Sequence, residues 1–280
     1  MKVAVTSSSR FNLYASSLIA RLRQRGVRVE AVICTERSRT AQLRDYTRRH
    51  GVAAAIRKLL EVYNVGSERG SALQNELSAY ARQHTLTGWN SSLPSLAARH
   101  AIRYLSARGI NAPEVVSFVR GAEIDLLLNA GAEIFRRDII GAVRRGILNG
   151  HMGYLPTYRG YNVLEWSLFA GHQVGVTLHF IDTGIDTGDI LRFVPIPVEA
   201  GDTIESLRAK SYPVKIDLMA WAIDALDAGC HRTSQRPSEG RQYFAMHPRL
   251  RAVAEAKIDR PFTPPAPQEP ATYADHAGGR

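Results

Sequence analysis

The sequence predicts an α/β fold with a doubly wound, mostly parallel sheet, and three observations support this class. The chain opens with an apolar run at residues 2–5, a polar loop, helical periodicity up to Gly26 and a β-branched run at 27–34. Strand, helix and strand in this order form a βαβ unit with parallel strands. The same alternation of strand and helix patterns resumes near residue 109. Finally, a chain of 280 residues that is 45% hydrophobic and 22% charged can form a sizeable core.

The later elements follow from the same two kinds of pattern. Apolar residues at helical spacing predict helices at 113–120, near 136–145, at 162–170 and at 202–229. Asp202 or Thr203 is suited to cap the last of these at its N-terminus. Short apolar or β-branched runs predict strands at 124–129, 146–149, 174–181 and 190–198. The loops after the strands, at 130–132, 150–160 and 182–189, are therefore expected to meet at one edge of the sheet.

The predicted organisation is one large α/β domain at residues 1–228 with a helical, basic insertion at about 37–100. We expect residues 37–82 to lie outside the core layers of this domain. A short C-terminal extension at 229–259 is less regular. Residues 260–280 are rich in proline and are predicted to be a disordered tail.

The charge balance favours anionic partners. Lysine and arginine number 36 against 26 aspartate and glutamate, which gives a formal net charge of +10. Residues 37–60 hold seven basic residues and one acid, Asp45. Such a run is typical of a solvated helical face, and it is also compatible with binding nucleic acid, an acidic substrate or a membrane surface.

Several classes of protein are disfavoured by missing patterns. No run of about 18 apolar residues predicts a membrane span, and the first residues lack the apolar stretch of a signal peptide. Cys34 and Cys230 form neither a disulfide framework nor a CxxC pair, so a cytoplasmic location is expected. The fingerprints of dinucleotide-binding folds, P-loop nucleotidases and zinc proteases are absent, as is the nucleophile elbow. We therefore expect no metal.

The segment ILNGHMGYLPTYRG carries the residues best suited to chemistry. Asn149 and His151 lie at the carboxyl end of a predicted strand, where open parallel sheets bind ligands, and alternation places both side chains on one face. Gly150 and Gly153 remove bulk where a ligand or backbone must approach. The loop DTGIDTGD ends the next long strand, so Asp186 could reach the same edge.

This trio suits acyl transfer to an amine. Asn149 can donate a hydrogen bond to the oxyanion that develops on the attacked carbonyl. His151 can relay a proton, and Asp186 can orient the imidazole and stabilise its charge. An isolated histidine, asparagine or aspartate in such a position is more often structural, so the residues alone leave both interpretations open.

The motifs resemble those of the folate-dependent formyltransferases. NGHMGYLPTYRG is similar to their signature Asn-x-His-x-Ser-x-Leu-Pro-x-x-Arg-Gly, and GVTLHFIDTGIDTGDIL is similar to their Gly-Val-Thr strand and Asp-x-Gly loop. The resemblance spans about residues 1–10 and 110–225. It implies a Rossmann-like formyltransferase fold, 10-formyltetrahydrofolate as co-substrate, and Asn149, His151 and Asp186 as the catalytic set. The motif serine is replaced by Gly153, so its hydroxyl is lost.

The resemblance also implies where ligands bind. The folate is expected between the 129–135 and 181–186 loops, bordered by the segment after His151; the residues concerned are Asn129, Gly131, Ile134, Phe135, Leu155, Pro156, Ile181 and Asp182. Some relatives bind an acceptor phosphate at the first loop, which here offers Ser7, Ser8, Ser9 and Arg10. That loop could equally be only a polar connection. Trp166 and His179 are interpreted as structural.

The acceptor is predicted by elimination. About 50 residues follow the long helix, fewer than the tRNA-binding barrel of methionyl-tRNA formyltransferases, so tRNA is not expected. The purine-pathway glycinamide enzyme resembles a shorter chain without a helical insertion like the one at 37–100. Formyltetrahydrofolate hydrolases typically carry a regulatory domain before the first strand, whereas this sequence starts directly at that strand. A small amine, phosphorylated or nucleotide-linked as in an amino sugar or natural-product precursor, is therefore expected, with a homodimer left open. A protein of a different class, a non-catalytic anion- or nucleic-acid-binding protein on this fold, is the remaining alternative.

Overall fold

The computed structural model describes residues 1–35, 47, 52, 68–131 and 133–258, and its centre is a seven-stranded sheet of order β3-β2-β1-β4-β5-β7-β8. The first five strands in this order are parallel, whereas β7 pairs antiparallel with both β5 and β8. The predicted mostly parallel sheet is therefore confirmed. The strands are β1 (Val3–Ser7), β2 (Val29–Thr35), β3 (Arg103–Ala107), β4 (Leu126–Ala130), β5 (Gly146–His151), β7 (Gly175–Phe180) and β8 (Ile190–Pro195).

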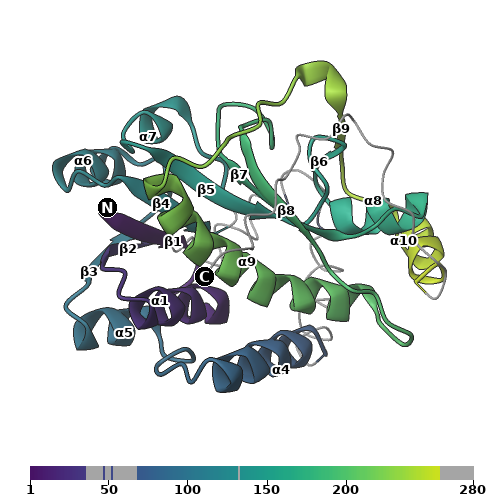
Figure 1. The fold of residues 1–280 in the computed structure, drawn as a ribbon, viewed down its shortest axis with the longest axis horizontal. Helices are drawn as coiled ribbons and strands as arrows, with labels where there is room; N and C mark the ends of the chain where they lie inside the picture. Colours follow the sequence, from purple (N-terminus) through teal and green to yellow (C-terminus); the bar gives the residue numbers. More distant parts are fainter. Residues whose placement is uncertain (36–46, 48–51, 53–67, 132, 259–280) are drawn as a thin grey trace, which may run out of the picture.

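Helices cover both faces of the sheet, as the doubly wound class requires (Figure 1). Alternation along β1 shows the two faces, because Val3 and Val5 pack in one apolar cluster and Ala4 packs in the other. The first cluster includes residues of α1 (Leu13–Gln24), α4 (Glu68–Gln83), α5 (Leu93–Arg99), α8 (Val163–Ala170) and α9 (Ile204–Asp227). The second includes residues of α6 (Pro113–Gly121) and α7 (Arg137–Ile140).

Every strand predicted for the central sheet is present, and β3 and the helix near 136–145 are two of the places where the structure differs from the prediction. β3 was not predicted, since it is a partly exposed strand, RYLSA, without an apolar run. The helix expected near 136–145 has only four residues, because Gly141 is its C-cap and the chain then turns into β5. Thr203 caps α9, and its side chain accepts a hydrogen bond from the backbone N–H of Ser206.

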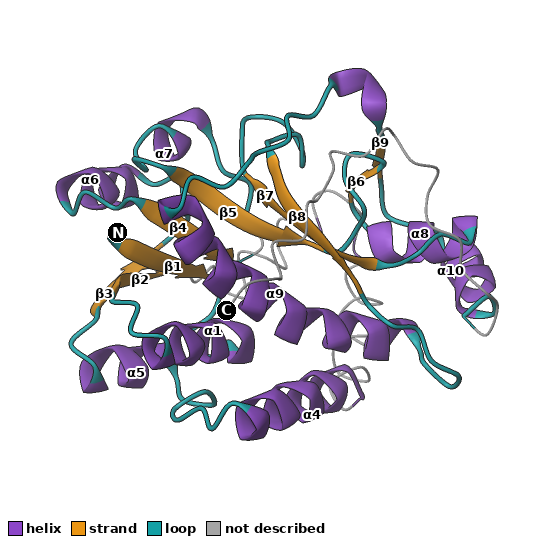
Figure 2. Cartoon of the chain, in the orientation of Figure 1, coloured by secondary structure: helices purple, strands orange, loops and turns teal. Residues whose placement is uncertain are grey.

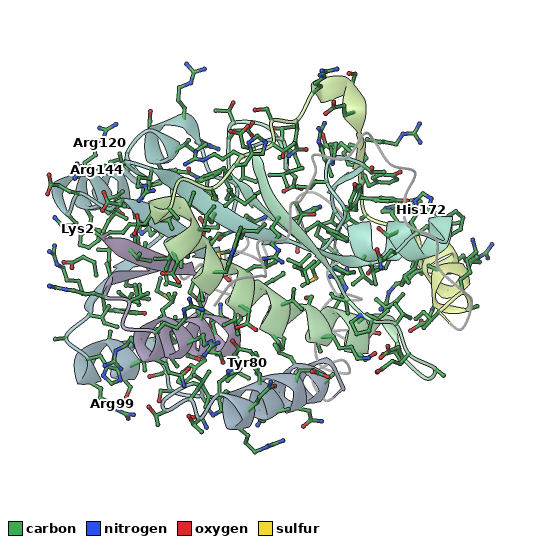
Figure 3. All side chains as sticks on the ribbon, viewed as in Figure 1. Lys2, Tyr80, Arg99, Arg120, Arg144 and His172 are labelled. Atoms are coloured by element: carbon green, nitrogen blue, oxygen red, sulfur yellow. The ribbon has the colours of Figure 1, made fainter. Side chains whose placement is uncertain are left out.

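The described part of the insertion belongs to the core, which corrects the expectation that residues 37–82 stand apart from it. On α4, Leu77, Tyr80 and Ala81 are buried in the first cluster. The Tyr80 hydroxyl, which lies beside α9 in Figure 3, donates to Asp217 Oδ1 over 2.6 Å. Helix α4 thus packs against α9 and α1, the helices that lie on the sheet, and extends the first cluster outward. The basic run at 37–60, apart from positions 47 and 52, and the predicted tail at 260–280 lie outside the described residues.

The C-terminal extension packs on the segment that follows β5. Its strand β9 (Arg241–Tyr243) pairs with β6 (Tyr158–Gly160) in a small second sheet that lies beside α8 (Figure 2). The 3-10 helix η1 (Pro237–Glu239) precedes β9, and α10 (Pro248–Glu255) follows it and packs against α8. Trp166 on α8 donates from Nε1 to the carbonyl of Phe244 over 3.0 Å, in keeping with its expected structural role. Within the described residues, no helix has the length and apolar character needed to cross a membrane.

Candidate active site

The candidate site begins with a row of polar side chains across the sheet. Register pairs Asn129 at the end of β4 with Asn149 on β5, and Asn149 with His179 on β7. β5 pairs in parallel with β4 and antiparallel with β7, so residues of both strands lie beside its carboxyl end. The result is a continuous polar line at the carboxyl edge of β4 and β5, where open α/β sheets bind ligands.

A directional chain of hydrogen bonds fixes both asparagine side chains. The hydroxyl of Thr6 and the backbone N–H of Gly131 each donate to Asn129 Oδ1 over 3.0 Å. Asn129 Nδ2 then donates to Asn149 Oδ1 over 3.1 Å. The amide nitrogen of Asn149 must therefore face away from Asn129, since its oxygen is already committed as an acceptor.

His179 receives the next hydrogen bond of this chain. Its Nδ1 lies 2.7 Å from the carbonyl of Phe180, which can only accept, so Nδ1 carries the proton. Nε2 then carries a lone pair and accepts a hydrogen bond from Asn149 Nδ2 over 3.1 Å. Burial, and secondarily the neighbouring His151, lowers the pKa of His179 to about 4, so the ring is neutral near pH 7. One of the two Asn149 amide hydrogens remains available to a ligand.

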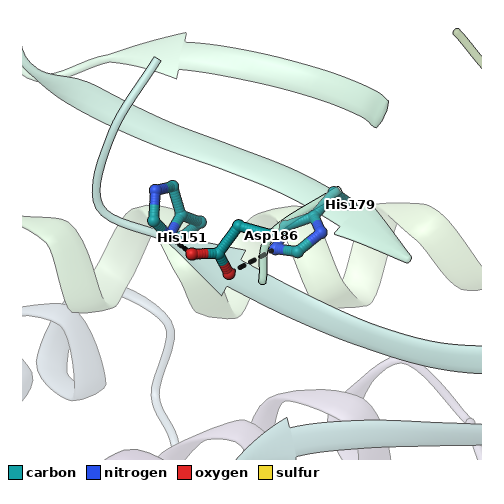
Figure 4. Close-up of side chains that lie close together, drawn as sticks. All are labelled: His151, His179 and Asp186. Carbon is teal, nitrogen blue, oxygen red and sulfur yellow. Dashed lines mark ion pairs between the residues drawn. The ribbon is translucent and has the colours of Figure 1, made fainter. Parts of the chain in front are cut away.

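His151 and Asp186 form the second half of the site (Figure 4). His151, at the end of β5, is 6% exposed; its Nε2 lies 2.7 Å from the carbonyl of Tyr158, and its Nδ1 lies 3.4 Å from Asp186 Oδ2. Both ring nitrogens thus face acceptors. A ring with a proton on each nitrogen satisfies both, whereas a neutral ring would turn a lone pair toward one of them.

The position of Asp186 is set by its loop. Its φ of 53° lies in the left-handed region, which aspartate tolerates better than most residues. The backbone N–H of Gly160 donates to Asp186 Oδ2 over 2.8 Å, and Gln235 Nε2 donates to the Asp186 carbonyl over 3.2 Å and to the Gly188 carbonyl over 2.5 Å. The carboxylate is therefore held by the loop after β5 and by the C-terminal extension.

His151, His179 and Asp186 also have the composition of a metal site, with one ligand atom of each within 4.8 Å of the others. Two of the possible ligand atoms, however, already accept hydrogen bonds, and both nitrogens of His151 face acceptors. His179 Nε2 accepts from Asn149, and Asp186 Oδ2 accepts from Gly160. The trio therefore fits proton and charge handling better than metal binding, in line with the expectation from the motifs.

A cavity of about 210 Å³ opens beside Asn149. Of the sites predicted from the sequence, Asn129, Gly131 and Ser8 lie in its wall. Gly150, predicted to make room for a ligand, and Ala130 of the 129–135 loop lie there too. The wall also contains residues that the sequence did not single out: Asn12, Tyr14, Tyr212 and Lys215. The cavity thus joins the first loop, the end of β5 and helix α9 at one place.

The other residues predicted to contact folate have different environments. Phe135 is 5% exposed within the second apolar cluster, whereas Ile134 is 70% exposed, so Ile134 is the one of the two that a ligand could reach. Leu155 is buried, and Pro156 follows it after a cis peptide bond. Ile181 is half-buried and packs against the second cluster.

Two predicted ligand contacts have structural partners instead. Asp182 Oδ1 accepts from the Thr187 hydroxyl over 2.6 Å and from the backbone N–H of Gly184 over 3.0 Å, so this carboxylate organises the loop. Ser7 is fully buried; its hydroxyl donates to the carbonyl of Ser9 and accepts from Asn12 Nδ2. In the first loop, Ser8 and Arg10 are exposed and Ser9 is half-buried.

Besides Asn12, Tyr14 and Tyr212, three more residues at the candidate site were not predicted to belong to it. Thr6 and His179 complete the hydrogen-bond chain, and Lys215 lies in the cavity wall. His179 alternates with Thr177 on a strand next to the Asp186 loop, which is a signal that it faces the same edge as Asn149. The alternation alone does not show that His179 lies opposite Asn149; the register of β5 against β7 does.

The departure from the motif at Gly153 also has a structural counterpart. A Cβ atom at this position would lie 3.1 Å from His151 Nε2 and 3.0 Å from Val163 Cγ2, which is tighter than most real contacts. A serine would therefore require a small shift of its neighbours. In this chain the carbonyl of Tyr158 serves as the partner of His151 Nε2.

Comparison with known proteins agrees with this geometry. The family model described as formyl transferase matches residues 1–222. The methionyl-tRNA formyltransferase of Geotalea uraniireducens (strain Rf4) is 32% identical over 136 residues, which cover 48% of this chain and 44% of that protein. The chain thus aligns with less than half the length of this curated relative.

Solved structures show the same fold. Phosphoribosylglycinamide formyltransferase from Streptococcus pneumoniae TIGR4 has a TM-score of 0.52 and 20% identity, over 81% of this chain and 98% of that chain. A sugar 3N-formyltransferase solved in the presence of dTDP and 5-N-formyl-THF has a TM-score of 0.54 and 14% identity, over 92% of this chain and 78% of that chain. At these identities the likeness concerns the fold alone, but the family model covers most of the chain. The chain belongs to the formyl transferase family.

Proposed function

We propose that this chain is an N-formyltransferase that moves a formyl group from 10-formyltetrahydrofolate to the amine of a small acceptor. One observation carries the proposal above all. The hydrogen-bond chain from Thr6 to His179 engages one amide hydrogen of Asn149 and, among the described residues, leaves the other unbonded, in a cavity wall and next to the His151–Asp186 pair. An oriented donor beside a proton-carrying group is what acyl transfer to an amine requires.

Asn149 supplies the oxyanion donor. When the acceptor nitrogen attacks the formyl carbon, negative charge grows on the carbonyl oxygen, and the free Asn149 amide hydrogen can bond to it. Its orientation is set in advance by Asn129 and His179, so no reorganisation is needed at the moment of reaction. By comparison with other oxyanion donors, we expect a contribution of about 10²–10³ in rate.

His151 and Asp186 handle the proton. The attacking amine gains a positive charge and must lose a proton, and the leaving nitrogen must gain one. An imidazolium at His151, balanced by Asp186, stabilises the oxyanion and can exchange a proton with the reacting groups. The burial of His151 strengthens these interactions because water screens them weakly there.

The donor is expected at the edge formed by the 129–135 and 181–186 loops. When bound, 10-formyltetrahydrofolate supplies the activated formyl carbon. Backbone groups near Gly131 and the exposed side chain of Ile134 offer polar and apolar contact there, and Ile181 borders the same edge. The fold neighbour solved with 5-N-formyl-THF supports a folate in this class of protein.

For the acceptor, we propose a nucleotide-linked amino sugar or another small natural-product amine, and a cytoplasmic location. The sugar formyltransferase and glycinamide neighbours favour a small acceptor. The curated relatives are named methionyl-tRNA formyltransferases, so tRNA stays an alternative acceptor despite the opposite expectation from the sequence. A hydrolase would need water in place of the amine.

The test follows tetrahydrofolate formation and the mass of the formylated product with a panel of amines. The panel holds nucleotide-linked amino sugars, methionyl-tRNA, glycinamide ribonucleotide and a water-only reaction, each repeated with Asp186→Asn. Turnover that depends on one amine and is lost in the variant supports the proposal and identifies the acceptor. Turnover without amine indicates a hydrolase. Absence of both turnover and folate binding would favour a non-catalytic anion- or nucleic-acid-binding protein.

A further inference from the structure

Lys215 is a buried lysine that the proposed chemistry does not use. It lies on α9, is only 8% exposed, and its stem packs against β5, where a Cβ at Gly150 would come within 2.8 Å of Lys215 Cγ. Glycine at position 150, between Asn149 and His151, is what allows the lysine to cross the strand at this point. The stem thus crosses β5 between the two residues proposed for catalysis, on the face opposite to their side chains. Lys215 and Asn149 nevertheless line the same cavity at the edge of the sheet.

The ammonium group of Lys215 has aromatic neighbours but, within the part of the chain that the structure describes, no counter-ion. Its Nζ lies 5.0 Å from the ring centroid of Tyr212 and 5.9 Å from that of Tyr14. Among the described residues it makes no hydrogen bond or ion pair. A buried charge without a partner is costly, so such a group either loses its proton or is paired when a ligand binds.

A second unpartnered donor lies beside it. The hydroxyl of Tyr14 is buried and has no hydrogen-bond partner within the described part of the chain. Tyr14, Tyr212 and Lys215 all lie in the wall of the 210 Å³ cavity that also contains Asn149. Buried polar groups are nearly always paired, so two unpaired donors in one cavity wall point to a missing acceptor.

The electrostatic surroundings favour an anion as that acceptor. The titratable and charged groups facing Lys215 are Tyr14 on α1 and Tyr212 and Arg208 on α9, and none of them is acidic. The start of α1, with Asn12 as its N-cap, also borders the cavity, and a helix N-terminus carries partial positive charge.

We propose that Lys215 and Tyr14 bind the anionic group, a phosphate or a carboxylate, of an acceptor whose amine lies a few bonds away beside Asn149. The proposal rests on the proposed formyl transfer and names its substrate class. A cavity of 210 Å³ holds roughly seven water molecules at about 30 Å³ each, so both groups must belong to one small fragment. Lys215 then distinguishes anionic from neutral amines by charge.

The proposal predicts a pH-dependent affinity. Burial, with a smaller contribution from Arg208, lowers the pKa of Lys215 to about 7 in the free protein. Only the protonated form attracts an anion, so affinity should fall as pH rises through 7. For a group with this pKa, the protonated fraction drops about 20-fold between pH 6.5 and 8.5.

Binding can be tested without catalysis. Titration calorimetry would use sulfate as the phosphate probe and acetate as the carboxylate probe, since neither changes charge between pH 6.5 and 8.5. We expect binding by the wild type that weakens about 20-fold at pH 8.5, and a loss of about 10- to 100-fold in Lys215→Met, as for one hydrogen bond to a charged group. Lys210→Met is the matched control, because Lys210 is on the same helix but pairs with Glu199 and Asp202.

Tyr14→Phe, which removes only the hydroxyl, should weaken binding several-fold and keeps the test valid if Lys215→Met does not fold. Absence of binding by the wild type, or equal binding by both variants and the wild type, would overturn the proposal. The probe that binds more tightly identifies phosphate or carboxylate as the preferred group.

Turnover separates this proposal from the proposed function. Matched pairs of amines, glucosamine 6-phosphate with glucosamine and glycine with glycinamide, would be compared in the wild type and Lys215→Met. A selective loss for the anionic member of a pair supports the assignment of Lys215. Equal losses for both members would contradict it while leaving formyl transfer intact. If no amine is formylated, the proposed function fails, and the anion probes still decide whether the site exists.

Discussion

Asn149 and His179 face each other across the antiparallel strands β5 and β7, and Asn149 Nδ2 donates to His179 Nε2 over 3.1 Å. A neutral imidazole thereby holds the amide that is proposed to bind the oxyanion. The relationship gives His179 a positioning role, since it acts on the reaction only through Asn149. It also explains why a histidine is fully buried at the end of a strand without being protonated.

His179→Ala should lower kcat about 10-fold, because Asn149 would lose the partner that fixes its amide. Asn149→Ala should lower kcat by about 10²–10³. In the double variant the His179 change should add little, since its effect passes through Asn149. Steady-state kinetics of the four proteins measure this coupling. Fully additive losses would show that His179 acts independently.

Asp186→Asn should reduce kcat by about 10²–10⁴, the usual range for loss of an acid–base pair. Asparagine also tolerates the left-handed backbone at this position, so the fold should be retained. Asp189→Asn is the control on the same loop, where the carboxylate accepts a hydrogen bond from Ser234. Comparable losses in both variants would indicate that the loop, rather than the Asp186 charge, had been disturbed.

Thr6→Val keeps the shape of a buried side chain and removes the hydroxyl at the start of the hydrogen-bond chain. Asn129 Oδ1 would keep the N–H of Gly131 as a donor. We expect a stability loss of about 1 kcal/mol and a decrease of a few-fold in kcat. Chemical denaturation and kinetics measure the two effects. An unchanged kcat would mean that Gly131 alone is enough to orient Asn129.

Lys215→Met should stabilise the protein at low pH. The pKa of Lys215 falls from 10.5 in the unfolded chain to about 7 in the fold, so the unfolded state binds more protons between these values. The cost of burying the lysine is therefore complete below pH 7 and vanishes as pH rises toward 10.5. With about 1.4 kcal/mol for each pKa unit, the variant should gain up to about 5 kcal/mol at pH 6. Denaturation at pH 6 and pH 10 would reveal the difference, and an equal gain at both would refute the explanation.

Leu77→Ala should cost about 2–5 kcal/mol, because Leu77 on α4 is completely buried between the helices of the first cluster. The exposed Gln74 on the same helix offers the control, and Gln74→Ala should change stability by less than about 0.5 kcal/mol. Denaturant unfolding of both variants decides whether α4 contributes to the core. A loss below 1 kcal/mol for Leu77→Ala would mean that the helix is dispensable.

What the sequence could predict depended on whether a feature is local. Asn149 and His151 were found because their spacing on one strand places them together, and Asp186 was found because its loop has a motif. His179 was missed, since its role depends on the register between two strands, which no local pattern encodes. Lys215 could not be predicted for a similar reason. In the sequence it is one of several polar residues of an amphipathic helix, and only the packing of α9 against β5 shows that it is buried. β3 and the burial of α4 were likewise decided by packing and not by propensity.

Gln235 donates hydrogen bonds to the backbone carbonyls of Asp186 and Gly188, and this determines which fragments of the chain can keep the Asp186 loop in place. The family model ends at residue 222, yet two hydrogen bonds to the loop that carries Asp186 come from residue 235. Arg159, beside the same loop, also donates to Gln235 Oε1. The segment matched by the family model is therefore shorter than the segment that positions Asp186. A fragment cut after α9 would keep every proposed catalytic side chain but lose the hydrogen bonds from Gln235 to the backbone of the Asp186 loop.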